Sequence, residues 1–212
     1  DNESEELWTL KLGTQNRDYG NGVASDSYGN LYVAGFASAG LDGNTYFGST
    51  DIVLMKYNSS GTKQWTQQFG TNGDDEANGV TTDSSGNVYV VGKTGGHLEG
   101  ASSGSYDPFI VKYNSSGIKQ WIKQFGTSGY DWAWGVATDS LDNVYVTGYV
   151  GRGLHGNSHY GSNDIFLVKY NSSGTKQWTK QLGSDQIDHG FDIAVDSENN
   201  LYVTGYTKGV LD

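Results

Sequence analysis

Aspartate recurs at fixed positions along this chain, and its carboxylate is the side chain best suited here to bind a metal ion. Three sets repeat at intervals of 56 or 57 residues, namely Asp18, Asp75, Asp131 and Asp188; Asp26, Asp83, Asp139 and Asp196; and Asp51, Asp107 and Asp164. A ring of carboxylates with backbone carbonyls would suit Ca²⁺, which takes oxygen ligands. The spacing does not match an EF-hand loop, so we favour acceptors of hydrogen bonds from loop amides, once per repeat. We therefore expect no metal site and no cofactor.

The sequence contains little evidence of a catalytic motif. The four His do not share a repeat position, and no zinc-binding spacing or Gly-x-Ser-x-Gly elbow stands out. The absence of Cys removes thiolate chemistry. One active site would not need the same carboxylate in every repeat. We expect no catalytic residues and no enzyme, and a lyase or hydrolase remains an alternative.

The residues that follow the first repeated Asp vary from copy to copy, and several of them are aromatic. After the first repeated Asp the copies are "YGNG", "EANG", "WAWG" and "HGFD". The candidate ligand-binding residues are Trp132, Trp134, His189, Phe191 and Tyr19, with Arg152 and His155 in a neighbouring loop. Aromatic platforms near polar groups suit a carbohydrate or a peptide. The alternative is packing, which we favour for Trp134, whereas we expect Trp132 to be exposed.

The elements that must position these residues form a tandem array. "KYNSSGTKQW" occurs at 56–65 and 169–178, and "KYNSSGIKQW" at 112–121. Related segments, such as "GNVYVVGK" at 86–93, recur with the same period. Such a period indicates a solenoid, propeller or similar array. The copies span about 8–64, 65–120, 121–177 and 178–212, within a single domain.

Each copy predicts four strands, which in the second copy are 78–83, 87–92, 107–113 and 118–126. The first is small, the next two are almost continuously apolar, and the last alternates with Lys and Gln. This order predicts an all-β propeller of four-stranded antiparallel blades, arranged radially from a hub. We expect "LWTLKLG" at 7–13 to be an outer strand, and the last repeat to be incomplete after its second strand.

A combination of residues in this period resembles a known family. "DIFLVKYNSSGTKQW", followed by Gly, Asp and "NNLYVTGYT" between 164 and 207, is similar to the bacterial SBBP beta-propeller repeats. The resemblance covers essentially the whole chain. It implies a propeller that is extracellular or surface-associated, with no single activity and no shared catalytic residues.

Composition limits the partners. The chain of 212 residues has a net charge of −11, which disfavours nucleic acid and anionic membranes. No apolar run reaches the length of a membrane helix. We expect a recognition scaffold for a carbohydrate or protein ligand at its loop-rich face. The alternative is an assembly module that self-associates through open blade edges, or that belongs to a larger parent with further blades.

Overall fold

The fold, given by a computed structural model that describes residues 8–100 and 102–211, is almost entirely β. The strands are β1 (Asp18–Ser25), β2 (Leu31–Ala37), β3 (Asp51–Tyr57), β4 (Lys63–Phe69), β5 (Asp75–Thr82), β6 (Val88–Thr94), β7 (Asp107–Tyr113), β8 (Lys119–Gln124), β9 (Trp132–Thr138), β10 (Val144–Val150), β11 (Asp164–Tyr170), β12 (Lys176–Leu182), β13 (Asp188–Val195) and β14 (Leu201–Thr207). A short 3-10 turn, η1 (Leu154–Gly156), lies between β10 and β11. Within the described ranges, no helix has the length and apolar character needed to cross a membrane.

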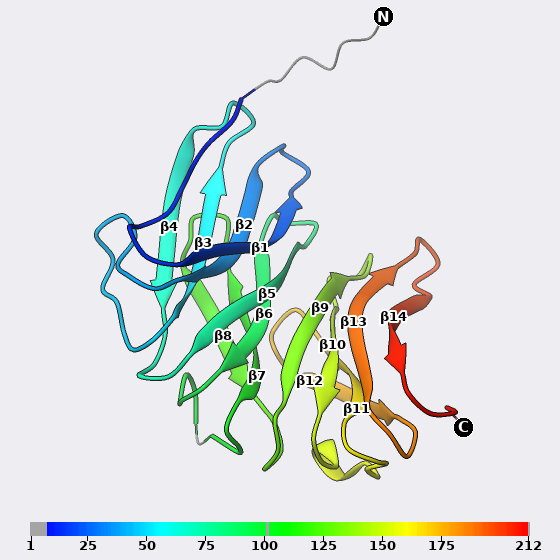
Figure 1. The fold of residues 1–212 in the computed structure, drawn as a ribbon. Helices are drawn as coiled ribbons and strands as arrows, with labels where there is room; N and C mark the ends of the chain where they lie inside the picture. The colour runs from blue at the N-terminus through cyan, green and yellow to red at the C-terminus, as the bar shows by residue number, and fades with distance from the viewer. Residues whose placement is uncertain (1–7, 101, 212) are drawn as a thin grey trace, which may run out of the picture.

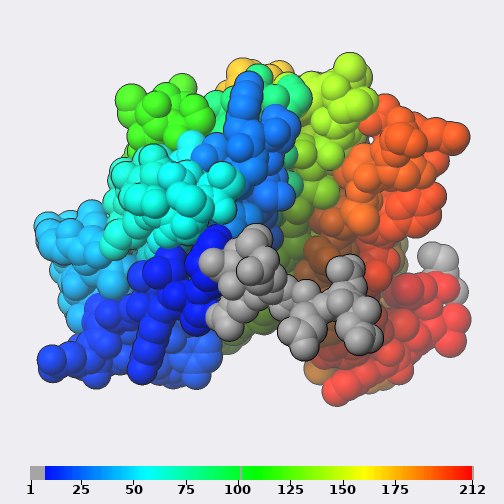
Figure 2. Space-filling view, turned by 90° about the horizontal axis from the view of Figure 1, so that it is seen from above, coloured from blue at the N-terminus to red at the C-terminus, as the bar shows by residue number. Residues whose placement is uncertain are grey.

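The strands form antiparallel sheets that follow one another along the chain. Three sheets have four strands, β1–β4, β5–β8 and β9–β12, and the described part of the last contains β13 and β14. The first strands of successive sheets are neighbours, β1 with β5, β5 with β9 and β9 with β13, so they line a common hub. The sheets lie in sequence order in Figure 1, and the colours of Figure 2 run in an arc from blue to red. The predicted propeller blades are confirmed, including the incomplete last one.

The first turn of each blade needs a residue with positive φ. Gly29 and Gly86 occupy this position in the first two blades, with φ of 78° and 74°. Asp142 and Asn199 replace them in the other two, with φ of 59° and 64°. Asp and Asn tolerate the left-handed region better than other residues with a Cβ, so the same turn forms in all four blades.

The core lies between adjacent blades. The middle strands β6, β7 and β10 are buried along their whole length, whereas the outer strands expose Lys and Gln. Between the first two blades, Ile52 and Leu54 of β3 pack against Phe109 and Val111 of β7. The second and third blades therefore each bury one face against the blade before and the other against the blade after.

The predicted strand at 7–13 is wrong for the residues that the structure describes, and residue 7 lies outside them. Residues 8–17 are not part of a strand, and β1 is the first strand of the described chain. Trp8 nevertheless packs on the first blade, with its ring 6.5 Å from Tyr57 and close to Gly61. Trp121 contacts Tyr170 and Gly174 of the third blade in the same way. We call the contact between two adjacent blades a joint. Trp8 thus packs against the first blade at the position where, at a joint, the outer-strand Trp of one blade packs against the next.

Candidate functional site

The variable residues at the start of each inner strand form cross-strand pairs with the second strand of the same blade. The pairs are Tyr19 with Phe36, Glu76 with Lys93, Trp132 with Tyr149, and His189 with Tyr206. The rings of the first and third pairs stack at 5.0 and 6.0 Å, and Lys93 Nζ lies 3.5 Å from Glu76 Oε1. Opposed residues of matched type stabilise antiparallel strands. Packing therefore explains part of the variation at this position.

Trp132 is half-buried among neighbours from two blades. Lys93 Nζ lies 4.2 Å from the centre of its ring, an attractive cation–π geometry. Tyr106 meets the ring edge-on at 6.3 Å, and Trp134 lies 5.3 Å away. The Trp132 indole N–H is buried and has no hydrogen-bond partner among the described protein atoms. Trp132 is therefore held in place by its surroundings.

The aromatic contacts continue across the joint between the third and fourth blades. His189 stacks on Tyr149 with ring centroids 3.8 Å apart, and its Nε2 lies 2.9 Å from Asn163 Nδ2. Burial is the main cause that lowers the pKa of His189. A neutral imidazole with its proton on Nδ1 can accept a hydrogen bond from the Asn163 amide at Nε2. His189 is thus neutral at pH 7 and packs at the contact between the third and fourth blades.

A β-bulge interrupts every inner strand at the same position. The register of β9 with β10 skips Trp134, and the corresponding bulged residues are Asn21 in β1, Asn78 in β5 and Phe191 in β13. A bulge leaves one residue outside the ladder and redirects its side chain. Opposite the third bulge, a Cβ on Gly148 would come within 1.9 Å of the Trp132 carbonyl oxygen. The Gly of the repeated "YVxG" motif is therefore required by the bulge.

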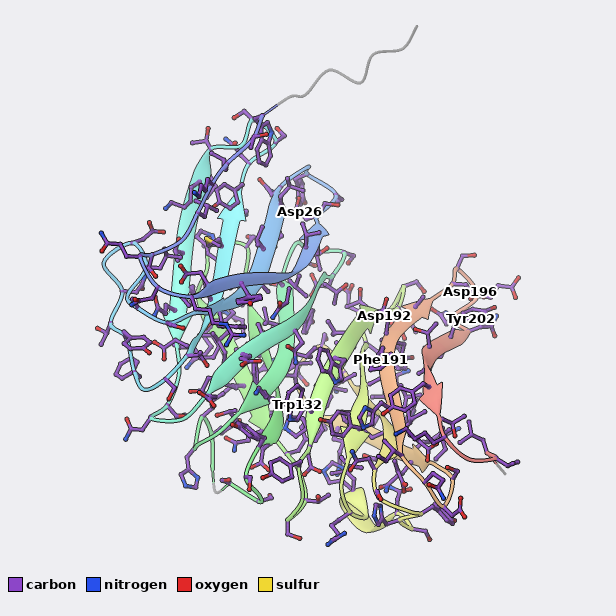
Figure 3. All side chains as sticks on the ribbon, in the orientation of Figure 1. Asp26, Trp132, Phe191, Asp192, Asp196 and Tyr202 are labelled. Carbon is purple, nitrogen blue, oxygen red and sulfur yellow. The ribbon has the colours of Figure 1, made fainter. Side chains whose placement is uncertain are left out.

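These bulged residues line a groove of about 600 Å³ at the hub, which we call the hub groove. Its side chains come from all four blades and include Arg17, Tyr19, Asn21, Phe36, Glu76, Asn78, Trp134, Phe191 and Asp192. Tyr19 and Phe191 are 49% and 45% exposed. The Arg17 guanidinium lies 4.8 Å from the centre of the Tyr19 ring. Phe191 and Asp192 belong to β13, where Figure 3 labels them.

The bulged residue forms a hydrogen bond to the next blade at two of the three contacts between adjacent blades. At the third contact it does not. Asn21 Nδ2 donates to the Ala77 carbonyl oxygen at 2.9 Å, and Asn78 Nδ2 donates to the Ala133 carbonyl oxygen at the same distance. Trp134 occupies this position in the third blade, and its buried indole N–H has no acceptor among the described residues. A buried donor without an acceptor costs about 1–3 kcal/mol. Trp134 therefore leaves an unsatisfied donor at the contact between the third and fourth blades, beneath the surface of the hub groove.

The structure brings together five of the seven residues that the sequence singled out. Trp132, Trp134, His189 and Phe191 form a continuous set of ring contacts, and Tyr19 lies in the hub groove with Trp134 and Phe191. The sequence favoured exposure for Trp132 and packing for Trp134. Both rings are half-buried, and it is Trp134 that lines the groove.

Arg152 and His155 lie apart from this set. Arg152 Nη1 donates to the neighbouring Gly151 carbonyl oxygen. His155 Nδ1 lies 2.8 Å from Thr179 Oγ1 on β12, and burial lowers its pKa. The sequence reasoning missed Phe36 and Tyr149. The sequence could have indicated them, because the residue that follows the Gly of the second strand varies among the repeats.

The repeated aspartates act as hydrogen-bond acceptors in the loops, as predicted. Asp75 accepts from the backbone and hydroxyl of Thr71, and Asp83 accepts from the backbone amides of Ser85 and Asn87. The third set differs, because Oδ1 of Asp51, Asp107 and Asp164 is buried without a hydrogen-bond partner in the described chain. No group of three or more His, Cys, Asp or Glu within the described residues could hold a metal ion.

Comparisons with known proteins agree with this architecture. The family SBBP, a beta-propeller repeat, matches residues 7–40, 64–99, 120–149 and 177–212. An uncharacterised WD repeat-containing protein of Acanthamoeba polyphaga mimivirus is 28% identical over 94% of this chain, and the regulatory protein FlaEY of Caulobacter vibrioides is 27% identical over 79%. The aligned regions make up only 19% and 20% of those two proteins.

A solved structure shares the fold alone. A Bacteroides caccae protein of unknown function superposes with a TM-score of 0.52 at 13% identity, and the match covers 93% of this chain and 56% of that one.

Proposed function

This chain belongs to the SBBP beta-propeller repeat family, and from that premise we propose that it is a non-catalytic recognition scaffold that binds its ligand in the hub groove. The supporting observation is the bulge in each inner strand. The bulged residues Asn21, Asn78, Trp134 and Phe191 all line the same groove. A rigid scaffold that presents variable side chains at one place is the usual design of a binding site.

The chemistry of the groove favours a carbohydrate or a peptide. Tyr19 and Phe191 offer partly exposed rings at opposite blades, and such rings stack on sugar faces or apolar side chains. Arg17, Asn21 and Glu76 add polar groups to the wall, and such groups fix the orientation of a ligand.

The same contacts support the absence of catalysis. Of the two groove carboxylates, Glu76 lies beside Lys93, and Asp192 Oδ1 accepts from the amide of the next residue, Ile193. Neither is arranged beside a nucleophile as a general base would be. We place the chain at the bacterial surface or outside the cell, a location that rests on the family resemblance alone.

The test is a screen of neutral glycans and of peptides against the chain, followed by two variants. Phe191→Ala should remove about 2 kcal/mol or more of binding free energy with little change in stability, because its ring is exposed. Trp132→Ala should instead lower the free energy of unfolding by about 2–4 kcal/mol, because the ring is packed among Lys93, Tyr106 and Tyr149.

Calorimetric binding and urea melts measure the two effects separately. Trp65→Ala, in an outer strand away from the groove, is the control that should change stability and leave the affinity unaltered. A ligand whose affinity is indifferent to Phe191→Ala and to Tyr19→Ala would place recognition elsewhere and refute the groove.

A further inference from the structure

Two buried aspartates face each other at each joint, one from either blade. The pairs are Asp51 with Asp75, Asp107 with Asp131, and Asp164 with Asp188, and all six residues are 0% exposed. In the second joint, a Cβ added to Gly126 would lie within 3.0 Å of both Asp107 Oδ1 and Asp131 Oδ2. Gly70 and Gly183 lie in the same way against the other two pairs. The first two pairs lie between blades whose four strands are all described.

The two members of a pair differ in the hydrogen bonds that they accept. Asp131 accepts at both oxygens, whereas Asp107 accepts at Oδ2 alone. The donors to Asp131 are Thr127 and Gly151, and those to Asp107 are Ser103 and Gln124. In the first joint, Asp75 likewise accepts at both oxygens and Asp51 at Oδ2 alone. Oδ1 of Asp51 and of Asp107 has no donor among the described residues, so it is free to carry a proton and donate it.

No cation neutralises these two pairs in the part of the chain that the structure describes. The ion pairs of Lys there all involve other carboxylates. The other titratable side chains that act on the pairs are Tyr46 near Asp51 and Tyr149 near Asp131, and both tyrosines are neutral at pH 7. Two buried carboxylates at close range therefore repel each other, which favours the protonated form of one of them.

The pKa shifts and the space in the joint agree with a proton. Burial is the main cause that raises the pKa of Asp131, and the charge of Asp107 adds to it. The pKa of Asp51 is raised in the same way. No third His, Cys, Asp or Glu of the described residues completes a metal site with either pair. Beside Gly126 there is no room even for a methyl group, so a proton fits this joint better than a metal ion does.

The third joint has a different group for the same task. His159 Nδ1 lies 3.2 Å from Asp164 Oδ2, and no His holds the equivalent position in the first two blades. The charge of Asp188 also acts on His189. An imidazole can take up a proton there, whereas the first two joints have only their carboxyls.

We propose that the first two joints each bind one proton from the solvent, shared between the paired carboxyls, and that this proton strengthens the contact between the blades in mildly acidic solution. In the second joint the proton is carried by Asp107 Oδ1 and donated toward Asp131 Oδ2. In the first joint Asp51 Oδ1 donates toward Asp75 Oδ2. The pairs are separate from the ligand proposed for the hub groove, so either proposal can fail alone.

The effect on stability has a defined sign. A carboxyl of raised pKa supplies stability that is fully present below the unfolded-state pKa of about 4 and is lost as the pH rises through the folded-state pKa. The pairs therefore stabilise the fold increasingly as the pH falls from neutral toward about 4. His155 and His189, whose pKa values are lowered, act in the opposite direction. The test must therefore follow single carboxyls and compare variants.

The first experiment is a pH titration of the full chain, followed by NMR of the ¹³C-labelled Asp carboxyls. Each of the first two pairs should show two coupled steps, one of them well above the ordinary Asp pKa. Asp107→Asn should lower the apparent pKa of Asp131 by about half a unit or more, because it removes the facing charge. Asp139→Asn, which removes a buried carboxylate beyond the other end of β9, is the matched control and should leave the titration of Asp131 unchanged.

Urea melts give a second measurement that needs no resonance assignment. The unfolding constant of the parent, divided by that of Asp107→Asn, should fall at least about threefold between about pH 7.5 and pH 4.5, because the parent binds a proton that the variant does not. The same ratio for Asp51→Asn should fall similarly.

Three results would overturn the proposal. The first is a titration in which all four carboxyls of the first two joints show the ordinary Asp pKa or a lower one. The second is an apparent pKa of Asp131 that a folded Asp107→Asn variant leaves unchanged. The third is a melting temperature at pH 7 that Ca²⁺ raises and a chelator lowers, since a metal ion would then neutralise the pairs. If Asp107→Asn does not fold, the titration of the parent decides.

Discussion

Aspartates at two positions of the repeat differ in the direction in which their pKa is shifted. Burial alone would raise the pKa of Asp83, yet hydrogen bonds from Asn87 and Tyr89 and the ammonium of Lys112 bring that pKa below its ordinary value. Burial raises the pKa of Asp51, and the nearby carboxylate of Asp75 adds to the effect against only partial compensation. The hydrogen-bond donors and the charges around each buried carboxylate decide the direction of its pKa shift.

At neutral pH, Asp83→Asn should lower the free energy of unfolding by about 1–3 kcal/mol, because it leaves Lys112 without its carboxylate. The stability supplied by a carboxylate of lowered pKa is present above the unfolded-state pKa of about 4 and is lost as the pH falls through the folded-state pKa. Urea melts of the parent and the variant should therefore converge as the pH falls below about 4.

Asp51→Asn should behave in the opposite sense. A carboxyl of raised pKa contributes stability below the unfolded-state pKa of about 4, and that contribution is lost as the pH rises through the folded-state pKa. Asn keeps the shape and removes the charge, so the free energy of unfolding at pH 7 should equal or exceed that of the parent. A loss of more than about 1 kcal/mol at pH 7 would contradict this view of Asp51.

The hairpin between the third and fourth strands is a joint as well as a turn. Lys56 Nζ and Trp65 Nε1 both donate to the Ser115 carbonyl oxygen of the next blade, at 2.8 and 3.3 Å. The Trp65 ring lies against Gly117, where an added Cβ would come within 3.0 Å of it. Both partners of the joint therefore belong to the repeated decapeptide, one in each blade. This double constraint explains why the decapeptide is almost identical in three copies.

Trp121→Ala should destabilise the fold more than Trp178→Ala. Trp121 packs on Tyr89 in its own blade, and in the next blade it packs on Gly174 and donates to the Ser172 carbonyl oxygen at 3.2 Å. Trp178 packs on Tyr145 of its own blade. Thermal and urea melts should give a loss of about 2–4 kcal/mol for the first variant and roughly half of that for the second. Equal losses would show that the inter-blade contact contributes little.

Across the whole molecule, stability should be unequal from blade to blade. The second and third blades have a neighbour on each side, whereas β14 is mostly exposed. In repeat arrays, stability is approximately a sum of unit and nearest-neighbour terms. Exposed backbone with few buried contacts opens at low free energy.

Hydrogen exchange should report this gradient. Amides of β6, β7 and β10 should exchange slowest, and those of β14 fastest, with protection factors that differ by about 10² or more. Mass spectrometry of peptic fragments measures the order. Uniform protection from the first blade to the last would indicate that the array unfolds as one cooperative unit.

The sequence was sufficient for the architecture and insufficient for the orientation of the site. The strand predicted at 107–113 coincides with β7. A continuous apolar run that lies between two turns and recurs with a fixed period predicts a buried strand. Residues 132 and 134 would share a face in a regular strand, but the bulge at Trp134 separates their roles. Alternation does not reveal a bulge. Residues 8–13 carry a strand-like sequence, yet a ladder also depends on a neighbour that local sequence does not specify.

The joint built on Trp and Gly has a consequence for how such a chain can change over generations. Trp65 meets Gly117 and Trp121 meets Gly174 through the same atoms, so each blade carries the donor half of one joint and the acceptor half of another. A gene duplication of one period would insert a blade whose Trp and Gly already match those of both new neighbours, and a deletion of one period would bring a matching Trp and Gly together. At this contact, blade number can therefore vary by recombination without a compensating substitution.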